Sequence, residues 1–196
     1  MYTIYTTPAF ILKSSPQGES NRLYTLFTKD FGLLRASAQG VRFLKSKLRY
    51  KLQEFNLVEI TLVRGKEHWR ITNVGAEQSL SAEFKDNRPV LAIFARVFAL
   101  LRRLLHGEEK NGLLFAHLEE TLKFFSAKNL PVGDLTSLEC ILVLRLLHSL
   151  GYLGSSPEAE EFVASPFWDE SVLLKMGNWK KQALSVINQS LQETQL

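Results

Sequence analysis

Side chains capable of acid–base, nucleophilic or metal chemistry are few in this sequence and far apart. The four histidines, His68, His106, His117 and His148, contain no pair three or four residues apart, the spacing that places two ligands on one helix face. The single cysteine, Cys140, lies two helical turns from His148, but a leucine-rich helix favours core packing for both. One cysteine forms neither an internal disulfide nor a thiolate zinc site, so we predict no metal.

Carboxylates and cofactor motifs add no catalytic constellation. Three pairs of glutamates are adjacent in sequence, and neighbours on a helix diverge by about 100°, so we interpret them as solvated helix surface: Glu108–Glu109, Glu119–Glu120 and Glu160–Glu161. No GxxxxGK[ST], GxGxxG or GxSxG pattern is present. We therefore predict that the protein is not an enzyme and needs no cofactor.

Binding chemistry is concentrated in residues 35–51, which carry six cations and no acidic residue: Arg35, Arg42, Lys45, Lys47, Arg49 and Lys51. From Lys45 onward the cations alternate, and an extended chain would place them on one side, about 6.6 to 6.8 Å apart. This spacing is comparable to that of phosphates along an extended single strand, and Phe43 and Tyr50 are available to stack on bases. We predict a nucleic-acid site here. The alternative is a solvated loop or a lysine-protected edge strand.

The charge distribution supports the same half of the chain. The net charge is +4 over 196 residues. Residues 1–80 hold 12 Lys+Arg and 6 Asp+Glu (12 − 6 = +6), whereas residues 81–196 hold 12 and 14 (12 − 14 = −2). Such asymmetry points to nucleic acid or another acidic surface. The sequence has no apolar run of membrane-spanning length and no secretory pattern at its start, so we expect a cytoplasmic protein without a membrane partner.

The first 80 residues have the composition and turn signals of short strands. Five strands joined mostly by tight turns predict a small closed barrel, because closure removes exposed sheet edges. The expected strands are Tyr2–Lys13, Leu23–Thr28, Leu33–Ala38, Gln53–Val63 and His68–Val74, with Ser14–Ser20 as a loop.

Residues 81–196 change to a helical period. Apolar residues at i, i+3, i+4 and i+7 predict a bundle whose third helix is apolar nearly all round and therefore central. Thr136 and Glu139 form a capping-box pattern that would open this helix, and Gly177–Asn178 would break the remainder. The expected helices are Pro89–His106, Gly112–Ala127, Thr136–Leu150 and Trp179–Gln192. The fold class is thus α+β, with domains at 1–80 and 81–196.

The residues of the first half resemble a known family. AFILKSSPQGESNRLYTLFTKDFGLLRASAQG (9–40), followed by VRFLKSKLRYKLQEFNLVEI, is similar to the N-terminal region of the RecO recombination mediators. Gly18-Glu19-Ser20, Gly40-Val41-Arg42 and Lys45-Ser46-Lys47 carry much of the likeness. Beyond residue 77 the resemblance is patchy, with LRLLHSLGY (144–152) and the closing ALSVINQSLQETQL as its clearest parts.

The resemblance implies an N-terminal OB-fold and a helical C-terminal domain. It also implies binding of single- and double-stranded DNA, annealing of complementary strands, and loading of the recombinase onto coated single strands. The implied partners are a RecR-type protein and the acidic C-terminal tail of single-strand-binding protein. By position, Arg35, Arg42, Lys45, Lys47 and Arg49 match the family's basic segment. Many members carry a four-cysteine zinc module where this chain has GSSPEAEEFVA (154–164), so no zinc is assigned.

Two other functions stay open on the residues alone. The barrel could be an adaptor that binds an acidic peptide, or an RNA-binding OB-fold that contacts the 2′-hydroxyl. Competition between an acidic peptide and an oligonucleotide of equal charge separates the adaptor from the nucleic-acid binder.

Overall fold

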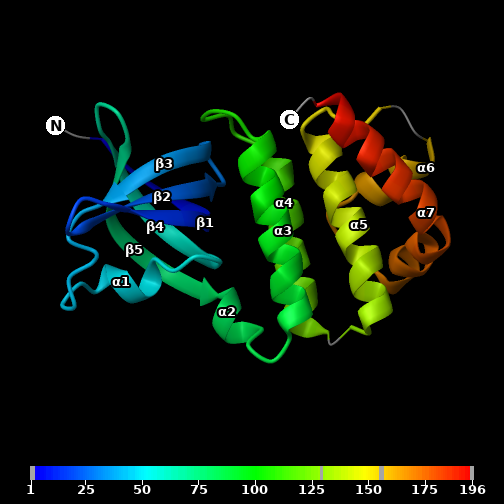
Figure 1. Ribbon diagram of the computed structural model, residues 1–196, viewed down its shortest axis with the longest axis horizontal. Helices are drawn as coiled ribbons and strands as arrows, with labels where there is room; N and C mark the ends of the chain where they lie inside the picture. Colours follow the sequence, from blue (N-terminus) through cyan, green and yellow to red (C-terminus); the bar gives the residue numbers. More distant parts are fainter. Residues whose placement is uncertain (1–2, 129, 155–156, 195–196) are drawn as a thin grey trace. The chain divides into compact units, whose positions relative to one another are not determined.

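The computed structural model describes residues 3–128, 130–154 and 157–194, apart from the side chain of Val132. Its chain divides into two compact units: residues 1–87 with 106–111, and residues 88–105 with 112–196 (Figure 1). The barrel unit therefore extends past the expected boundary at 80/81 and takes in a short loop from the helical half. Tyr2, Ser155–Ser156 and Gln195–Leu196, which belong to features predicted above, lie outside the described residues.

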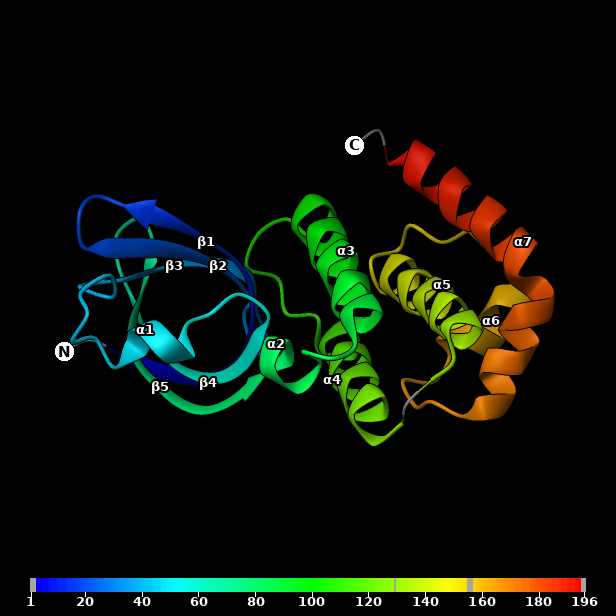
Figure 2. The same cartoon turned by 60° about the horizontal axis from the view of Figure 1, so that its bottom comes forward.

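Five strands form the barrel of the first unit. They are β1 (Ile4–Gln17), β2 (Asn21–Thr28), β3 (Gly32–Ala38), β4 (Asn56–Arg64) and β5 (Trp69–Ser79). Neighbours around the ring follow the order β1-β2-β3-β5-β4, and β4 returns to β1. Figure 2, turned by 60°, shows the strands curving round to meet. The predicted α+β class and the five-stranded OB-like barrel are confirmed.

Closure depends on β1, which is longer than predicted. Its first half pairs with β4 (Ile4↔Val63 to Phe10↔Leu57) and its second half with β2 (Ala9↔Thr28 to Gln17↔Asn21). The prediction that Ser14–Gln17 form a loop was wrong. Pro16 is compatible with a strand here because β1 has only one ladder neighbour at that point, so its missing N–H leaves no second partner unpaired. The ring is completed by a short parallel contact, Ala36↔Trp69 and Ser37↔Arg70.

Strand alternation fills the barrel with apolar side chains. On β3, Leu34, Ala36 and Ala38 point inward, whereas Leu33, Arg35 and Ser37 are partly or fully exposed. Tyr24, Ile60, Leu62 and Trp69 are among the other members of this core. Burial of these side chains against water is the main favourable term holding the ring together.

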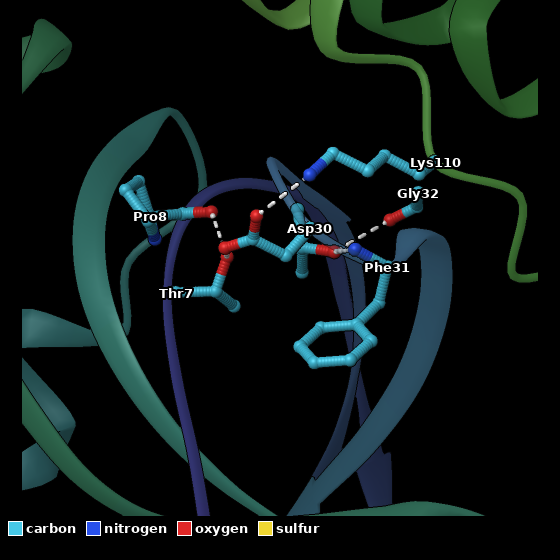
Figure 3. A network of polar contacts seen from close by, with 7 residues as sticks. Thr7, Pro8, Asp30, Phe31, Gly32 and Lys110 are labelled. Atoms are coloured by element: carbon cyan, nitrogen blue, oxygen red, sulfur yellow. Dashed lines mark hydrogen bonds and ion pairs between the residues drawn. The ribbon is translucent and has the colours of Figure 1, made fainter.

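A polar network covers one end of the barrel with the loop 106–111 (Figure 3). The Asp30 carboxylate accepts from Thr7 Oγ1 at 2.8 Å and from Lys110 Nζ at 3.2 Å. Trp69 Nε1 also donates to Glu108 of the loop. The Thr7 hydrogen bond, with Lys110, holds the pKa of Asp30 below its usual range. Gly32 is required beneath this loop, because its φ is 65° and an added Cβ would lie 2.0 Å from the Glu109 carbonyl oxygen.

The second unit is built around α5, as predicted. The helices are α3 (Arg88–Leu104), α4 (Gly112–Ala127), α5 (Val132–Ser149), α6 (Pro157–Val163) and α7 (Glu170–Glu193), while the short α2 (Leu80–Glu83) belongs to the barrel unit. α5 packs against α3, α4, α6 and α7. None of the helices in the described chain combines the length and apolar character needed to cross a membrane.

Two sequence signals in this half were misleading. Thr136 does not cap α5: the helix begins four residues earlier, and the Thr136 hydroxyl donates back to the Gly133 carbonyl. Gly177–Asn178 do not break α7, which runs unbroken from its Asp169 cap. Burial of Leu173 and Met176 before this dipeptide, and of Ala183 after it, overrides the weak local preference.

A buried guanidinium organises the connection between α6 and α7. Arg145 on α5 is 1% exposed, and it donates to the carbonyls of Phe162, Pro166 and Phe167 at 2.9 to 3.0 Å. Its charge also lies 4.3 Å from the Trp168 ring centroid. Burial lowers the pKa of Arg145 to about 10, so the group stays protonated at neutral pH. Carbonyl dipoles and an aromatic face thus take the place of a carboxylate partner.

His117 lies in the same core, and its burial makes the free energy of unfolding depend on pH. It is 0% exposed, and neither ring nitrogen has a hydrogen-bond partner in the described parts of the chain. Burial, with the nearby Arg145 and His148, lowers the pKa of His117 to about 4. The folded state therefore keeps this imidazole neutral well below the pKa of an unfolded histidine, about 6.5.

We expect the stability to fall with pH through this one group. Between pH 6.5 and 4 the unfolded chain binds a proton that folded His117 does not, so the free energy of unfolding drops as pH falls and levels off below 4. The loss from pH 7 to 5 is about 2 kcal/mol. Urea unfolding at both pH values measures this loss. The variant His117→Leu, which keeps the side-chain volume, should not show it. An equal loss in the variant contradicts the assignment.

Candidate nucleic-acid interface

The predicted binding residues, except Arg35, lie on the basic crossover, the name used here for residues 39–55 between β3 and β4. Two apolar anchors fix this segment to the barrel: Val41 is 1% exposed and Leu52 is 4% exposed, and both belong to the barrel core. The residues between the anchors are mostly exposed. The crossover is therefore an arch held at both ends by hydrophobic burial.

Hydrogen bonds fix the first end of the arch. Gly40, with φ at 63°, turns the chain out of β3, and its N–H donates to Asn21 Oδ1 at 2.9 Å. The Arg42 N–H donates to the Ser20 carbonyl, and Arg42 Nη1 donates to the Gly18 carbonyl at 2.7 Å. The GES turn and the GVR start of the crossover, distant in sequence, are thus one hydrogen-bonded unit.

The second end is fixed by an unusual backbone conformation. Phe55 has a φ of 69°, and it is the one non-glycine residue of the described chain with positive φ. Its N–H donates to the Ile11 carbonyl, and its own carbonyl accepts from the Leu80 N–H. A bulky residue adopts this conformation only where surrounding contacts impose it. Backbone bonds to β1 and to α2 supply that constraint, so the entry into β4 is fixed.

The expectation of an extended cationic row at Lys45–Lys51 was wrong. Turns join Gly40 to Ser46, and Leu48–Lys51 form the short helix α1, which packs beside β5 (Figure 1). At about 100° per residue, alternate residues of a helix point in nearly opposite directions. Leu48 in α1 is half-buried and Leu52, which follows the helix, is buried, whereas Arg49 in the same helix is exposed.

Most of the predicted cations are open to solvent, and one is not. Arg42, Lys45, Lys47 and Arg49 are exposed. The Lys51 ammonium instead donates to the carbonyls of Val74 and Gly75 at 3.2 and 2.9 Å, which ties α1 to β5. Lys51 therefore positions the crossover.

Aromatic side chains are exposed among these cations. Phe43 is 62% exposed and Tyr50 is 67% exposed, and Leu44 between them is 81% exposed. A folded barrel gains nothing by leaving large apolar groups in water, and their clustering on a cationic arch is typical of a contact surface. Stacking on bases needs such accessible rings.

Arg35 is separate from the arch. It is exposed on the outer side of β3, opposite Thr25 on β2. Ser37, the next outward residue on β3, lines a hollow that sequence reasoning missed. This hollow has a volume of about 890 Å³, and its lining combines three cations with apolar side chains: Arg64, Lys66 and Arg70 with Ile4, Leu48, Val63 and Ile71.

A second hollow of about 640 Å³ lies under the arch, between its two anchors. Val41 and Leu52 line it together with Arg42 and Arg49, and β2 contributes Arg22. Arg22 was not predicted, because the sequence around a lone cation on an apolar strand does not indicate which residues it faces in the fold. Alternation on β2 was the available hint, since Arg22 and Tyr24 share one face.

The residues considered for catalysis are not brought together. Cys140 is buried, and burial raises the pKa of its thiol, whereas His148 is exposed. A raised pKa is the reverse of thiolate activation. Over residues 3–128, 130–154 and 157–194, no group of three or more His, Cys, Asp or Glu side chains could hold a metal ion.

Comparison with known proteins gives consistent matches. Residues 1–79 match the family described as "Recombination protein O N terminal". Curated relatives described as "DNA repair protein RecO" include those of Desulfitobacterium hafniense strain DCB-2 (31% identical over 158 residues) and Dehalococcoides mccartyi (30% over 160). The matches cover 81% and 80% of this chain but 56% and 59% of the relatives. The chain thus spans little more than half their length.

Matched substitutions distinguish Lys51, which positions the crossover, from Lys47, which is exposed to solvent. Lys51→Met removes two hydrogen bonds from a charged donor, so we expect the free energy of unfolding to fall by about 1 to 3 kcal/mol. Lys47→Met, at an exposed position, should change it by less than about 0.5 kcal/mol. Urea unfolding of both variants measures the difference. Equal effects would contradict the positioning role of Lys51.

Proposed function

This chain belongs to the RecO family of DNA repair proteins, and from that premise we propose that its barrel unit binds single- and double-stranded DNA. In this proposal the protein anneals complementary strands and helps to load a recombinase onto coated single strands, without catalysing a reaction. The observation that carries the proposal is the basic crossover, where exposed Phe43 and Tyr50 lie among exposed cations.

The proposed mechanism uses two physical terms. Arg42, Lys45, Lys47 and Arg49 neutralise phosphates and release counterions, which gives affinity without sequence preference. Phe43 and Tyr50 stack on bases, which favours strands whose bases are unpaired. Annealing follows because neutralised strands repel each other less, while weak stacking lets bases leave the protein for their complement.

The proposed partners follow from the family and from charge. We propose a RecR-type partner and the acidic C-terminal tail of single-strand-binding protein, in the cytoplasm at the nucleoid. A coated strand presents such tails together with its DNA. A basic barrel that engages either would be drawn to the coated strand at a raised rate, because opposite charges steer encounter.

The second candidate is an adaptor for an acidic peptide, and the 890 Å³ hollow favours it. Its cations Arg64, Lys66 and Arg70 border apolar side chains, a lining that suits acidic and apolar residues in alternation. Arg70 is already oriented, since its Nη2 donates to Gln39 Oε1 at 3.0 Å. An adaptor would prefer such a peptide to an oligonucleotide of equal charge, whereas the leading proposal requires the reverse.

We expect salt dependence to report the crossover directly. For single strands each neutralised phosphate contributes about 0.7 to the slope of log K against log salt. Lys45→Ala with Lys47→Ala should therefore make the slope shallower by about 1.4, and anisotropy titrations from 50 to 200 mM salt measure it. Lys29→Ala with Lys66→Ala, which removes the same charge elsewhere in the barrel unit, is the matched control. An unchanged slope in the crossover variant contradicts the proposal.

Annealing of coated strands tests the mediator activity. The protein should accelerate pairing of complementary strands covered by single-strand-binding protein, and removal of that protein's acidic tail should reduce the acceleration. Replacing DNA by RNA of the same sequence tests the third possibility: tighter RNA binding would favour 2′-hydroxyl recognition over the DNA proposal.

A further inference from the structure

The hollow under the crossover has the chemistry of an anion site. Its charged lining consists of three guanidinium groups, Arg22, Arg42 and Arg49, and one carboxylate, Glu54, so its net charge is 3 − 1 = +2. The three arginines come from β2, from the start of the crossover and from α1. Segments distant in sequence thus bring the planar donors that fit phosphate oxygens to one concave surface.

The carboxylate in this hollow already accepts hydrogen bonds from a neighbouring serine. Glu54 Oε1 accepts from the Ser14 N–H at 2.8 Å and from Ser14 Oγ at 2.9 Å. Ser14 Oγ in turn accepts from Arg22 Nη2 at 2.9 Å. Glu54 therefore orients Arg22 through a serine, and no ion pair joins the two in the described structure.

Arg22 retains a donor without an acceptor. Its Nε is buried and has no hydrogen-bond partner among the described residues. A buried donor left unpaired is unfavourable, and native structures rarely keep one unless a ligand, ion or water completes it. The guanidinium of Arg49 also has no hydrogen bond or ion pair in the described chain, whereas Arg42 is oriented by the Gly18 carbonyl.

Tyr24 forms part of the same lining. Burial raises the pKa of Tyr24 to about 12, so its hydroxyl stays neutral and adds no negative charge beside an anion. Val41 and Leu52 supply an apolar side at the anchors of the arch. A volume of about 640 Å³ exceeds that of a phosphate group alone and leaves room for an attached sugar.

We propose that this hollow binds the terminal phosphate monoester of a DNA strand. A monoester carries a charge of about −1.5 to −2 at neutral pH, which matches the net +2 of the lining, whereas an internal phosphodiester carries only one negative charge. Arg22 and Arg49 supply the free donors, and Arg42 supplies the third cation. The site rests on the proposed DNA binding and gives it a preference for strand ends.

Paired oligonucleotides test this directly on the full chain. A labelled 12-nucleotide strand with a 5′-phosphate, the same strand with a 3′-phosphate, and one with two hydroxyl ends are titrated at fixed salt. We expect one phosphorylated strand to bind about tenfold more tightly than the hydroxyl strand, equivalent to about 1.4 kcal/mol. Equal affinity of all three overturns the end site while leaving general DNA binding intact.

Variants assign the preference to the hollow. Arg22→Gln should abolish the phosphate preference, and so should Arg49→Gln, an exposed position where the fold is not at risk. Lys45→Ala with Lys47→Ala should weaken all strands alike and keep the ratio. Preference that survives both arginine variants contradicts the proposal.

Free ligands distinguish the source of the phosphate. A nucleoside monophosphate should compete for the phosphorylated strand more weakly than an unlabelled phosphorylated strand does, and inorganic phosphate more weakly still. Competition in the reverse order would assign the hollow to a free anion and overturn the strand-end site. Absence of binding to every strand would refute the proposed function, and the end site with it.

Discussion

Burial of Val41 and Leu52 in the barrel core is the constraint on which the binding surface depends. Both side chains are buried in the barrel core, so the intervening chain must leave the barrel after Val41 and return to it at Leu52. The cations of this segment repel one another. Burial of the two anchors and the hydrogen bonds from Lys51 to the β5 carbonyls offset this repulsion. The hollow beneath the arch is a direct consequence, since the anchors form part of its lining.

Two cations illustrate how the chain treats positive charge in different ways. Arg145 is fully buried, and three carbonyls and the Trp168 ring satisfy it, so its charge stabilises the path of the chain between α6 and α7. Arg22 is partly buried, and its Nε has no acceptor in the described residues. This difference supports the proposed binding role of Arg22, because desolvated donors are costly unless something pairs them.

Much of the fold was predictable because its signals are local. Strand composition, turn residues and the 3.6-residue period indicated five strands and a central α5, and α4 was predicted with the bounds it has. The misses share a cause, which is that tertiary contacts override local preference. Ser14–Gln17 extend β1 because β2 offers a partner, and α7 continues through Gly177 because the residues around it are buried. The choice of residues 35–51 as the site rests on charge and stays a prediction, whereas its predicted extended geometry was wrong: turns carry Lys45, and α1 begins directly after Lys47.

The short helix changes what the alternation of cations accomplishes. In an extended chain the alternating cations would have formed one row, and every lysine would have faced the same phosphates. With α1 in place, Leu48 lines one hollow and Arg49 the other, so the crossover separates two concave surfaces of different character. One is rich in guanidinium groups and enclosed by the arch, and the other mixes cations with apolar side chains. The proposed strand-end site and the proposed peptide site draw on different cations, because Arg64, Lys66 and Arg70 of the second hollow lie outside the crossover, which contributes only uncharged side chains there.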